Sequence, residues 1–446
     1  MRSPNGRLPA ALLALALLAG TAACSGSGSG PGAHEPALTA PALPAGQRLA
    51  AGVVYQEFTA QGPAGPVRGH LVRIAPDAPV RLTGVHGRGL AEGQTVRDVA
   101  RRGHALAAVN ASYFDIRGGK GFAGYPGDPT GLYVEHGRVL SESRNDGAAL
   151  LLGRRGDRLT ARIAEVSTTG RIVASGPARA GGSGPAAPAE RVLDGVDRVA
   201  GRLRPCGGPD AERRIEDGRP LTRDARTGLC QDPDEIVQFT PEWGADTPGG
   251  PRGGDSDGVE ALLAADGTVR ALRSPAGGPV PPGGSVLQGI GAGAGWLRAH
   301  ARPGTRVTTT TTMTDPDGGP LPGGPVDSAV GGGARLLKGG ELALNERDLA
   351  RTERPARTVA GVTADGGVLL LVLDGREPGV STGATLAEAA GLLRSLGAVD
   401  GLNLDGGGSS TMVVAGALRN RPRESTGDPV SERRVATALA VLPAGS

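Results

Sequence analysis

Two aspartates each follow a short apolar run in the second half of the chain. Asp374 follows the run from Val368 to Leu373, and Asp405 follows the run from Val399 to Leu404. Continuous apolar runs of this length are typical of buried strands. An Asp-Gly pair after a strand is an ordinary turn, but two such carboxylates at one sheet edge could bind a ligand or transfer protons. We therefore treat both carboxylates as candidate site residues.

The segment between the two apolar runs predicts a helix. Thr385 and Glu388 have the spacing of a capping box at its start, and Gly397 stands where the helix should end. A strand, a helix and a strand of these lengths imply a parallel pair, whose strands end at the same edge of a sheet. The predicted fold class is α+β, a mixed sheet with helices that includes a strand-helix-strand unit at residues 368–405.

A second helix and strand carry another polar cluster to a strand end. Thr95 and Asp98 repeat the capping spacing, and a strand is predicted from Ala105 to Val109. This strand leads directly into Asn110-Ala-Ser-Tyr-Phe-Asp115. Asn110 could simply cap backbone groups there, and the aromatic pair could belong to the core. Asp115 nevertheless adds a third carboxylate to the candidates.

The first residues have the layout of a secretory signal peptide. Arg2 and Arg7 precede an apolar run from Leu8 to Leu18, and small residues then lead to Cys24. Cys24 with the Ser-Gly repeats after it resembles a bacterial lipoprotein signal, in which the cysteine is lipidated; plain secretion is the alternative. We expect a protein outside the cytoplasm, anchored to the membrane by lipid. The predicted segments are a signal peptide at 1–23, a disordered tether at 24–47 and a folded domain at 48–446.

The other cysteines and the overall charge narrow the classes of function. Cys206 and Cys230 are expected to form a disulfide, because no C-x-x-C motif or His cluster accompanies them. Polar, Gly/Pro-rich stretches near 176–190 and 205–230 indicate loop insertions. A formal charge of +3 over 446 residues, with basic residues scattered among acidic ones, gives no support to nucleic-acid binding. His spacing predicts no metal site, although a carboxylate-bound Ca²⁺ or Mg²⁺ stays open.

Six short segments occur in an order that resembles the phosphodiester glycosidase family. The segments are Asn110–Asp115, Ala329–Gly333, Arg357–Thr358, Leu373–Arg376, Asn403–Ser410 and Glu432–Arg433. The resemblance extends from about Val53 to Leu442 and is densest after Arg354. In that family the best-known activity removes N-acetylglucosamine from a sugar-1-phosphodiester, and bacterial relatives are exported proteins with surface glycopolymers as their expected substrates. One departure is Ala111-Ser112, where the family usually carries Gly-Gly.

The resemblance implies an enzyme that hydrolyses a glycosyl-1-phosphodiester bond. This reaction builds positive charge on the sugar ring and leaves a phosphate, so the site needs carboxylates near the sugar and hydrogen-bond donors near the phosphate. The predicted catalytic residues are Asp405, Asp374 and Asp115, two of which would share the roles of nucleophile or base and of acid. The predicted substrate-binding residues are Asn110, Tyr113, Arg357, Thr358, Arg376, Gly406, Gly407, Gly408, Ser409, Ser410, Glu432 and Arg433.

The turn from Gly406 to Ser410 is the predicted phosphate site. Its glycines allow close approach of the backbone, and its amides and hydroxyls can donate to an anion. Arg376 and Arg433 can grip a phosphate bidentately, although Arg433 could instead form an ion pair with an acidic neighbour. The Gly331–Gly333 run is interpreted as a packing turn.

Three functions follow from these residues. The first is an extracytoplasmic hydrolase that cleaves a glycosyl-1-phosphodiester bond in a surface glycopolymer or exopolysaccharide. The alternative is a non-catalytic lipoprotein that binds phosphorylated glycans, and a third is a phosphodiesterase that cuts the phosphorus-oxygen bond. The expected partners are the phosphoglycan substrate and, through the lipid anchor, the membrane, with no nucleic acid. The sequence indicates neither the sugar nor the oligomeric state.

Overall fold

The computed structural model describes residues 38, 43–115, 127–143, 147–176, 187–201, 232–249 and 258–445, with the backbone of short strands between 204 and 231. The chain divides into two units, Met1–His34 and Glu35–Ser446, and every element named below belongs to the second. The predicted signal peptide, Cys24 and Cys206 fall outside the described residues, as do most of the tether and of both insertions. For Cys230 the structure describes the backbone, which lies in a strand, and not the side chain. Lipidation and the disulfide therefore stay predictions.

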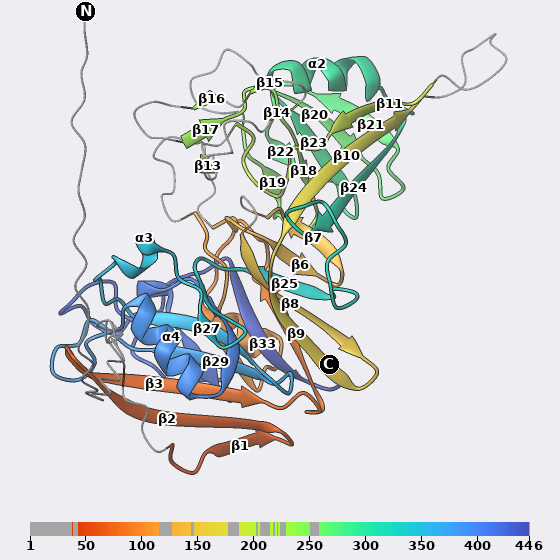
Figure 1. Cartoon of the computed structure of the whole chain (residues 1–446). Helices are drawn as coiled ribbons and strands as arrows, with labels where there is room; N and C mark the ends of the chain where they lie inside the picture. The colour runs from red at the N-terminus through yellow and green to blue at the C-terminus, as the bar shows by residue number, and fades with distance from the viewer. Residues whose placement is uncertain are drawn as a thin grey trace, which may run out of the picture. The chain divides into compact units, whose positions relative to one another are not determined.

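The largest sheet joins the beginning of the domain to its end (Figure 1). Among the described residues its order is β1-β2-β3-β29-β28-β30-β26-β27, and every neighbouring pair is antiparallel. In this order the strands are β1 (Gln47–Ala50), β2 (Val53–Gly62), β3 (Gly65–Ile74), β29 (Val368–Leu373), β28 (Arg357–Thr363), β30 (Ala398–Asn403), β26 (Arg335–Lys338) and β27 (Glu341–Leu342). Pairing of β3 with β29 brings residues about three hundred positions apart into direct contact.

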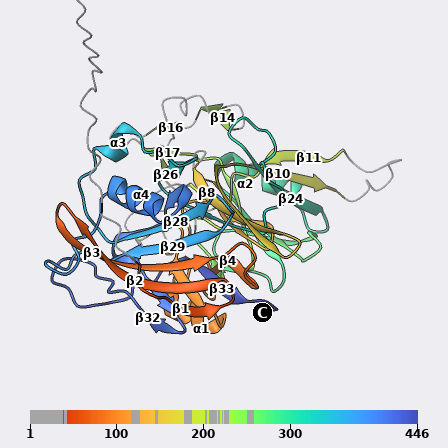
Figure 2. The same ribbon diagram turned by 60° about the horizontal axis from the view of Figure 1, so that its bottom comes forward.

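The predicted parallel pairing inside residues 368–405 is corrected by this order. The helix α4 (Leu386–Ser395) follows β29 and precedes β30, and the capping box of Thr385 and Glu388 forms as predicted. However, β28 lies between β29 and β30 and pairs antiparallel with both. The strand-helix-strand pattern cannot predict this insertion, because β28 comes before both β29 and β30 in the sequence. In the turned view, β28 and β29 lie side by side and α4 covers one face of the sheet (Figure 2).

Two further sheets enclose the main core with the first. The described residues form the orders β32-β31-β5-β33-β4 and β7-β6-β25-β8-β9. Apolar side chains from all three sheets share one buried cluster that includes Val72, Val109, Leu150, Leu370 and Leu439. The strands are β4 (Val80–His86), β5 (Ala107–Asn110), β31 (Met412–Val414), β32 (Ala417–Leu418) and β33 (Thr437–Pro443) in one sheet, and β6 (Tyr133–Glu135), β7 (Arg138–Ser141), β8 (Ala148–Arg155), β9 (Arg158–Glu165) and β25 (Ser328–Gly331) in the other.

The helix α1 (Val96–Arg102) orients the strand that ends at the polar cluster. Thr95 caps it by accepting a hydrogen bond from the amide of Asp98, as the spacing predicts. Val96, Val99 and Ala100 are its buried face, and this face packs against β5, β31 and β33. The helix therefore fixes β5, and with it Asn110, against the sheet.

The middle of the chain builds a second group of sheets with its own core, formed by residues such as Ile172, Ile236 and Leu287. Within it β20 and β21 form an antiparallel hairpin, and the helix α2 ends at His300. The elements are β10 (Ser167–Ser175), β11 (Ala189–Val192), β12 (Gly195–Val196), β13 (Arg204–Pro205), β14 (Ile215–Glu216), β15 (Arg219–Pro220), β16 (Thr222–Arg223), β17 (Leu229–Gln231), β18 (Ile236–Phe239), β19 (Asp246–Thr247), β20 (Val259–Leu263), β21 (Val269–Arg273), β22 (Gly278–Pro279), β23 (Ser285–Gly289), α2 (Gly291–His300), β24 (Arg306–Thr314) and, later, α3 (Glu346–Leu349).

Strands dominate the described residues, and the α+β class holds in this coarse form. None of the helices in the described part of the chain is both long enough and apolar enough to cross a membrane.

Candidate functional site

The two strand-end aspartates lie at the same end of the largest sheet. Leu373 pairs with Arg357 at the start of β28, and Asn403 pairs with Val359 two residues further on. Asp374 and Asp405 therefore leave the sheet one strand apart and in the same direction. The local cause is the shared direction of β29 and β30, which survives the insertion of β28.

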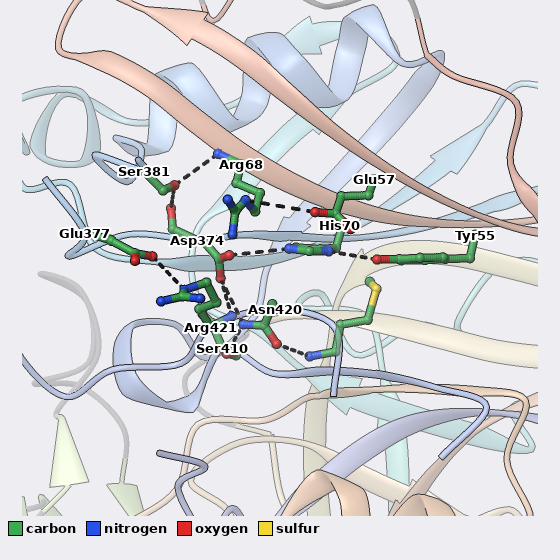
Figure 3. Close-up of polar contacts among 11 residues, drawn as sticks. Tyr55, Glu57, Arg68, His70, Asp374, Glu377, Ser381, Ser410, Asn420 and Arg421 are labelled. Carbon is green, nitrogen blue, oxygen red and sulfur yellow. Dashed lines mark hydrogen bonds and ion pairs between the residues drawn. The ribbon is translucent and has the colours of Figure 1, made fainter. Parts of the chain in front are cut away.

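Asp374 is fully enclosed by donors (Figure 3). Its Oδ1 accepts from Asn420 Nδ2 at 3.1 Å and from the backbone amide of Arg421 at 3.0 Å. Its Oδ2 lies 3.4 Å from His70 Nε2. The side chain is 1% exposed. This carboxylate is thus held on both oxygens by groups of the protein.

Those donors decide the charge of Asp374. Burial alone would raise the pKa of its carboxyl, but the hydrogen bond and the charge interaction with His70, with the donors from Arg421 and Asn420, outweigh burial and hold the pKa below its ordinary value. Ionised Asp374 is therefore the form that the fold stabilises.

His70 extends the network to a buried tyrosine on β2. Its Nδ1 lies 2.9 Å from the hydroxyl of Tyr55, and the two rings stack with centroids 6.4 Å apart. Nε2 of His70 faces Asp374, and Nδ1 on the other side of the ring faces the hydroxyl of Tyr55. Burial, with the nearby charge of Glu57, raises the pKa of Tyr55 to about 12, so the tyrosine stays protonated. Figure 3 shows Tyr55, His70 and Asp374 in one line.

Asn420 connects this network to the glycine-rich turn. Its Nδ2 also donates to the carbonyl of Ser410 at 2.8 Å, and its Oδ1 accepts from the amide of Met412 at 2.7 Å. The Asn420 side chain therefore links Asp374 to the backbone at the end of the turn and at the start of β31. The network holds the back of the turn, on the side away from solvent.

Asp405 is positioned through its backbone instead. Its amide donates to Ala111 O at 3.0 Å, and its carbonyl accepts from Asn110 Nδ2 at 2.6 Å. Asn110 Oδ1 accepts in turn from the hydroxyl of Thr358 at 2.7 Å and from the amide of Thr411 at 3.1 Å. Asn110 and Thr358, both predicted to bind substrate, are thus used to fix the strand end from which Asp405 projects.

The carboxyl of Asp405 has the opposite electrostatic character to that of Asp374. Burial raises its pKa from 3.8 to about 6, against the lowering effects of the hydrogen bond with Ser409 and of the Arg433 charge. A carboxyl with a pKa near neutrality can be ionised while it takes part in proton transfer. Among the three candidate carboxylates, Asp405 is the one best suited to react.

The turn after Asp405 is a short 3₁₀ helix at Gly407–Ser409. Gly407 has φ +63°, a left-handed conformation that favours glycine. At Gly408 an added Cβ would stand 2.6 Å from Glu424 Oε2 and 2.7 Å from Arg433 Nη2, so a larger residue would displace one of these two side chains. The amides of Gly407, Ser409 and Ser410 already donate to backbone carbonyls. The turn is therefore less free to bind an anion through these amides than the glycine pattern suggests.

Arg433 lies directly over the turn. Its guanidinium makes a bidentate ion pair with Glu424, with Nε 2.7 Å from Oε1, and its Nη1 donates to Ser409 Oγ at 3.1 Å. Arg376 lies on the other side of Gly407 and donates to the carbonyls of Arg423 and Glu424. Both predicted arginines are present at the turn, and each is oriented by the loop that carries Glu424.

Several predicted residues serve other contacts. Arg357 is buried and donates to Ala384 O at 2.9 Å and Glu353 O at 3.4 Å, so it braces the loop before β28. Glu432 pairs with Arg97 on α1. Asn403 Nδ2 donates to the hydroxyl of Tyr113 at 2.7 Å. These three predicted binding residues, Arg357, Glu432 and Tyr113, hold the elements of the site together.

Asp115 lies on the rim of the site. It lines a pocket of about 670 Å³ together with Phe114 and Arg433. Asp405 does not line that pocket, so Arg433 is the side chain shared by the pocket and the turn. Arg433 thus lines the pocket with Asp115 and contacts the turn that follows Asp405, and Asp374 is joined to the same turn through Asn420.

Three residues of the site were not predicted from the sequence. His70 lies in an apolar strand with no metal-like spacing, Asn420 follows a short hairpin, and Glu424 is one acid in a polar loop. His70 and Asn420 meet Asp374 across separations of 304 and 46 positions in the chain, whereas Glu424 meets Arg433 nine positions away. The pairing of β3 with β29 was the signal that could have placed His70 beside Asp374.

The described residues contain no group of three or more His, Cys, Asp or Glu side chains arranged to hold a metal ion.

Comparisons with known proteins agree with the motif order. Residues 257–442 match the family model described as phosphodiester glycosidase. A curated protein of Bos taurus, N-acetylglucosamine-1-phosphodiester alpha-N-acetylglucosaminidase, is 32% identical over 122 residues, which are 24% of this chain and 23% of that protein. The protein of the same name from Mus musculus is 29% identical over 136 residues, 27% and 26% of the two chains. The match thus spans about a quarter of the length of these curated relatives.

Solved structures share the fold over most of the chain. A protein of Burkholderia pseudomallei described as exported is 29% identical with a TM-score of 0.68, over 85% of this chain and 74% of that one. A hypothetical protein from Synechocystis is 19% identical with a TM-score of 0.61, over 90% and 64% of the two chains. The second likeness shows the fold alone.

Proposed function

We propose that the protein is a glycosidase that hydrolyses a glycosyl-1-phosphodiester bond in a surface glycopolymer or exopolysaccharide. The match of residues 257–442 to the phosphodiester glycosidase family model and to the curated relatives supports this proposal. Asp374, Asp405 and Arg433 all fall within the matched segment.

The reaction breaks the bond between the anomeric carbon and a phosphate oxygen. The oxygen of a water molecule bonds to the anomeric carbon, a proton of that water passes to a carboxylate, and the phosphate leaves as a monoester. Phosphate is already a good leaving group, so the reaction depends less on a general acid than on an ionised carboxylate near the sugar. We assign that carboxylate to Asp405.

The raised pKa of Asp405, beside Arg433 and Ser409, is the observation that carries this assignment. The guanidinium of Arg433 and the hydroxyl of Ser409 are the donors placed to meet a phosphate next to Asp405. Asp115, which lines the pocket beside Arg433, is the second carboxylate of the site. Asp374 takes the role of a positioning residue, because both of its oxygens are already bonded.

A synthetic N-acetylglucosamine-1-phosphodiester tests the proposal with purified protein. The expected result is release of free N-acetylglucosamine with the label of oxygen-18 water on the sugar. Label on the phosphate would instead identify a phosphodiesterase, since the phosphorus-oxygen bond would then have broken. Binding without any product would support the alternative, a non-catalytic lipoprotein that binds phosphorylated glycans.

We also propose that the protein works outside the cytoplasm, attached to the membrane through Cys24. The signal-like first residues support this location, as does the described export of the Burkholderia relative. Fractionation of cells that express the whole chain checks it: release by detergent but not by salt is expected. A Cys24→Ser variant should move to the soluble fraction, and salt release of the parent protein would contradict the anchor.

A further inference from the structure

The pocket beside the candidate site has a volume of about 670 Å³, within the range of sites for small molecules. Three arginines line it, Arg88, Arg433 and Arg434, together with two carboxylates, Glu92 and Asp115. The hollow therefore has both cationic and anionic groups on its walls.

The walls of the pocket are fixed by backbone contacts. Gln94 and Val435 exchange both backbone hydrogen bonds, at 3.0 and 2.9 Å, which sets the loop before α1 beside Arg434. A Cβ at Gly93 would lie 3.5 Å from the Cβ of Arg434. Gly127, with φ +136°, lies so close to Ala91 O that an added Cβ would be 3.0 Å from it. Glycines at positions 93 and 127 thus let these segments approach closely where they line the hollow, and the longer side chains complete its walls.

Two of the arginines have no protein partner to neutralise them. Arg88 and Arg434 are exposed, and neither forms a hydrogen bond or an ion pair with any other residue that the structure describes. Arg433 differs, because Glu424 and Ser409 hold it. An unpaired guanidinium in a hollow is suited to bind phosphate or carboxylate.

The position of the pocket indicates which part of the substrate it can bind. The sugar ring must lie at Asp405 for hydrolysis at the anomeric carbon, and its phosphate must then lie near Ser409 and Arg433. The pocket shares Arg433 with the turn and does not include Asp405. The group on the other side of the phosphate, the aglycone, is therefore the part of the substrate that reaches Arg88 and Arg434.

We propose that this pocket binds an aglycone that is itself an anionic sugar or polyol, bearing a phosphate or a carboxylate beyond the scissile phosphodiester. The proposal rests on the proposed function. Arg88 and Arg434 bind the additional negative charge, Glu92 and Asp115 accept hydrogen bonds from hydroxyl groups, and Phe114 offers an apolar face to the ring. The substrate class is thus a glycopolymer with repeated anionic units, not a phosphodiester with a neutral alcohol.

A matched pair of synthetic substrates tests the proposal. Both carry N-acetylglucosamine-1-phosphate in diester linkage, one to galactose and the other to galactose 6-phosphate. In the parent protein we expect kcat/KM to be about tenfold higher for the phosphorylated aglycone, equivalent to about 1.4 kcal/mol. The variant R88A/R434A should reduce this ratio to about one, and raised salt should reduce it in the parent protein. Arg270, exposed on β21 and without a described partner, supplies the control R270A, which should keep the tenfold ratio.

A ratio near one in the parent protein, or a tenfold ratio that persists in R88A/R434A, would overturn the proposal. If neither substrate is turned over, the proposed function fails, and calorimetry with galactose 6-phosphate against galactose decides the pocket by itself. Binding of galactose 6-phosphate but not of galactose, with that binding lost in R88A/R434A, supports the proposed anionic subsite. Equal binding of both sugars, or binding of neither, contradicts it.

Discussion

The aspartates that end β29 and β30 have matching places in the sheet and opposite environments. Asp374 is surrounded by donors from Asn420, Arg421 and His70, and its pKa is lowered, because these donors outweigh burial. Asp405 is also largely buried, but burial outweighs its donors and raises its pKa to about 6. Two carboxylates one strand apart therefore differ in what the fold does to their charge.

This difference indicates which of the two carboxylates can take part in proton transfer. A carboxylate whose oxygens are all bonded contributes by holding its neighbours, whereas one that the fold leaves partly uncompensated can exchange protons near neutral pH. Asp374 thus acts on the turn through Asn420, and Asp405 acts on the substrate.

The two residues also contribute to stability with opposite signs. Asp374 has a folded pKa below its unfolded value, so its contribution is present above about pH 4 and is lost as pH falls through the folded pKa. Asp405 has a folded pKa above its unfolded value, so its ionised form destabilises the fold at neutral pH, and this cost disappears as pH falls from about 6 toward 3.8.

The largest predicted effect is that of Asp405→Asn on turnover. Loss of the reacting carboxylate should lower kcat on the order of a thousandfold, while the free energy of unfolding at pH 7 stays equal or rises, because a buried charge is removed. At about 1.4 kcal/mol per pKa unit, the upper limit of that rise is about 3 kcal/mol. Rates of sugar release and urea unfolding measure the two effects. An active variant would refute the assignment of Asp405.

Asp374→Asn should instead lower the stability of the fold more than it lowers turnover. The new amide would face donors at Asn420 and Arg421, and the loss of a buried hydrogen-bonded charge should cost about 3 kcal/mol of unfolding free energy. Urea unfolding checks this value, with Asp317→Asn at an exposed turn as the control expected within about 0.5 kcal/mol of the parent. A variant as stable as the parent but without activity would show that Asp374 reacts.

Gly408→Ala tests the contact between the turn and the Arg433–Glu424 pair. The added Cβ must displace one of these side chains, so kcat/KM should fall about tenfold to a hundredfold, as expected when a positioned group is shifted by about 1 Å. Gly391→Ala is the matched control, because Gly391 lies inside α4 with open space at its Cβ; it should stabilise the fold by about 0.5 to 1 kcal/mol. Equal activity of both variants would exclude a role for the pair.

The smallest predicted effect belongs to Tyr55→Phe. Loss of the hydroxyl leaves His70 Nδ1 without its partner and should cost about 1 kcal/mol of unfolding free energy. Turnover should change less than twofold, because the tyrosine acts on Asp374 only through His70. Thermal unfolding and initial rates measure both, and a strong loss of turnover at unchanged stability would place Tyr55 nearer to the chemistry than we propose.

The sequence predicted the local features that short-range spacing encodes. The capping of α1 and α4 and the strands before Asp374 and Asp405 follow from residues within a few positions of one another. It did not predict that β28 separates β29 from β30, because pairing depends on which strand edge is open when the sheet assembles. For the same reason the partners of Asp374 were missed: His70 and Asn420 reach it from strands and loops far away in the chain.

The dependence of kcat/KM on pH tests the division between the two aspartates most directly. If Asp405 is the ionised carboxylate that reacts, kcat/KM for the synthetic phosphodiester should fall tenfold per pH unit below about pH 6. A value that stays constant from pH 7 to 5 and falls only below about pH 4, where a carboxylate with a lowered pKa titrates, would contradict the account and point to Asp374 instead.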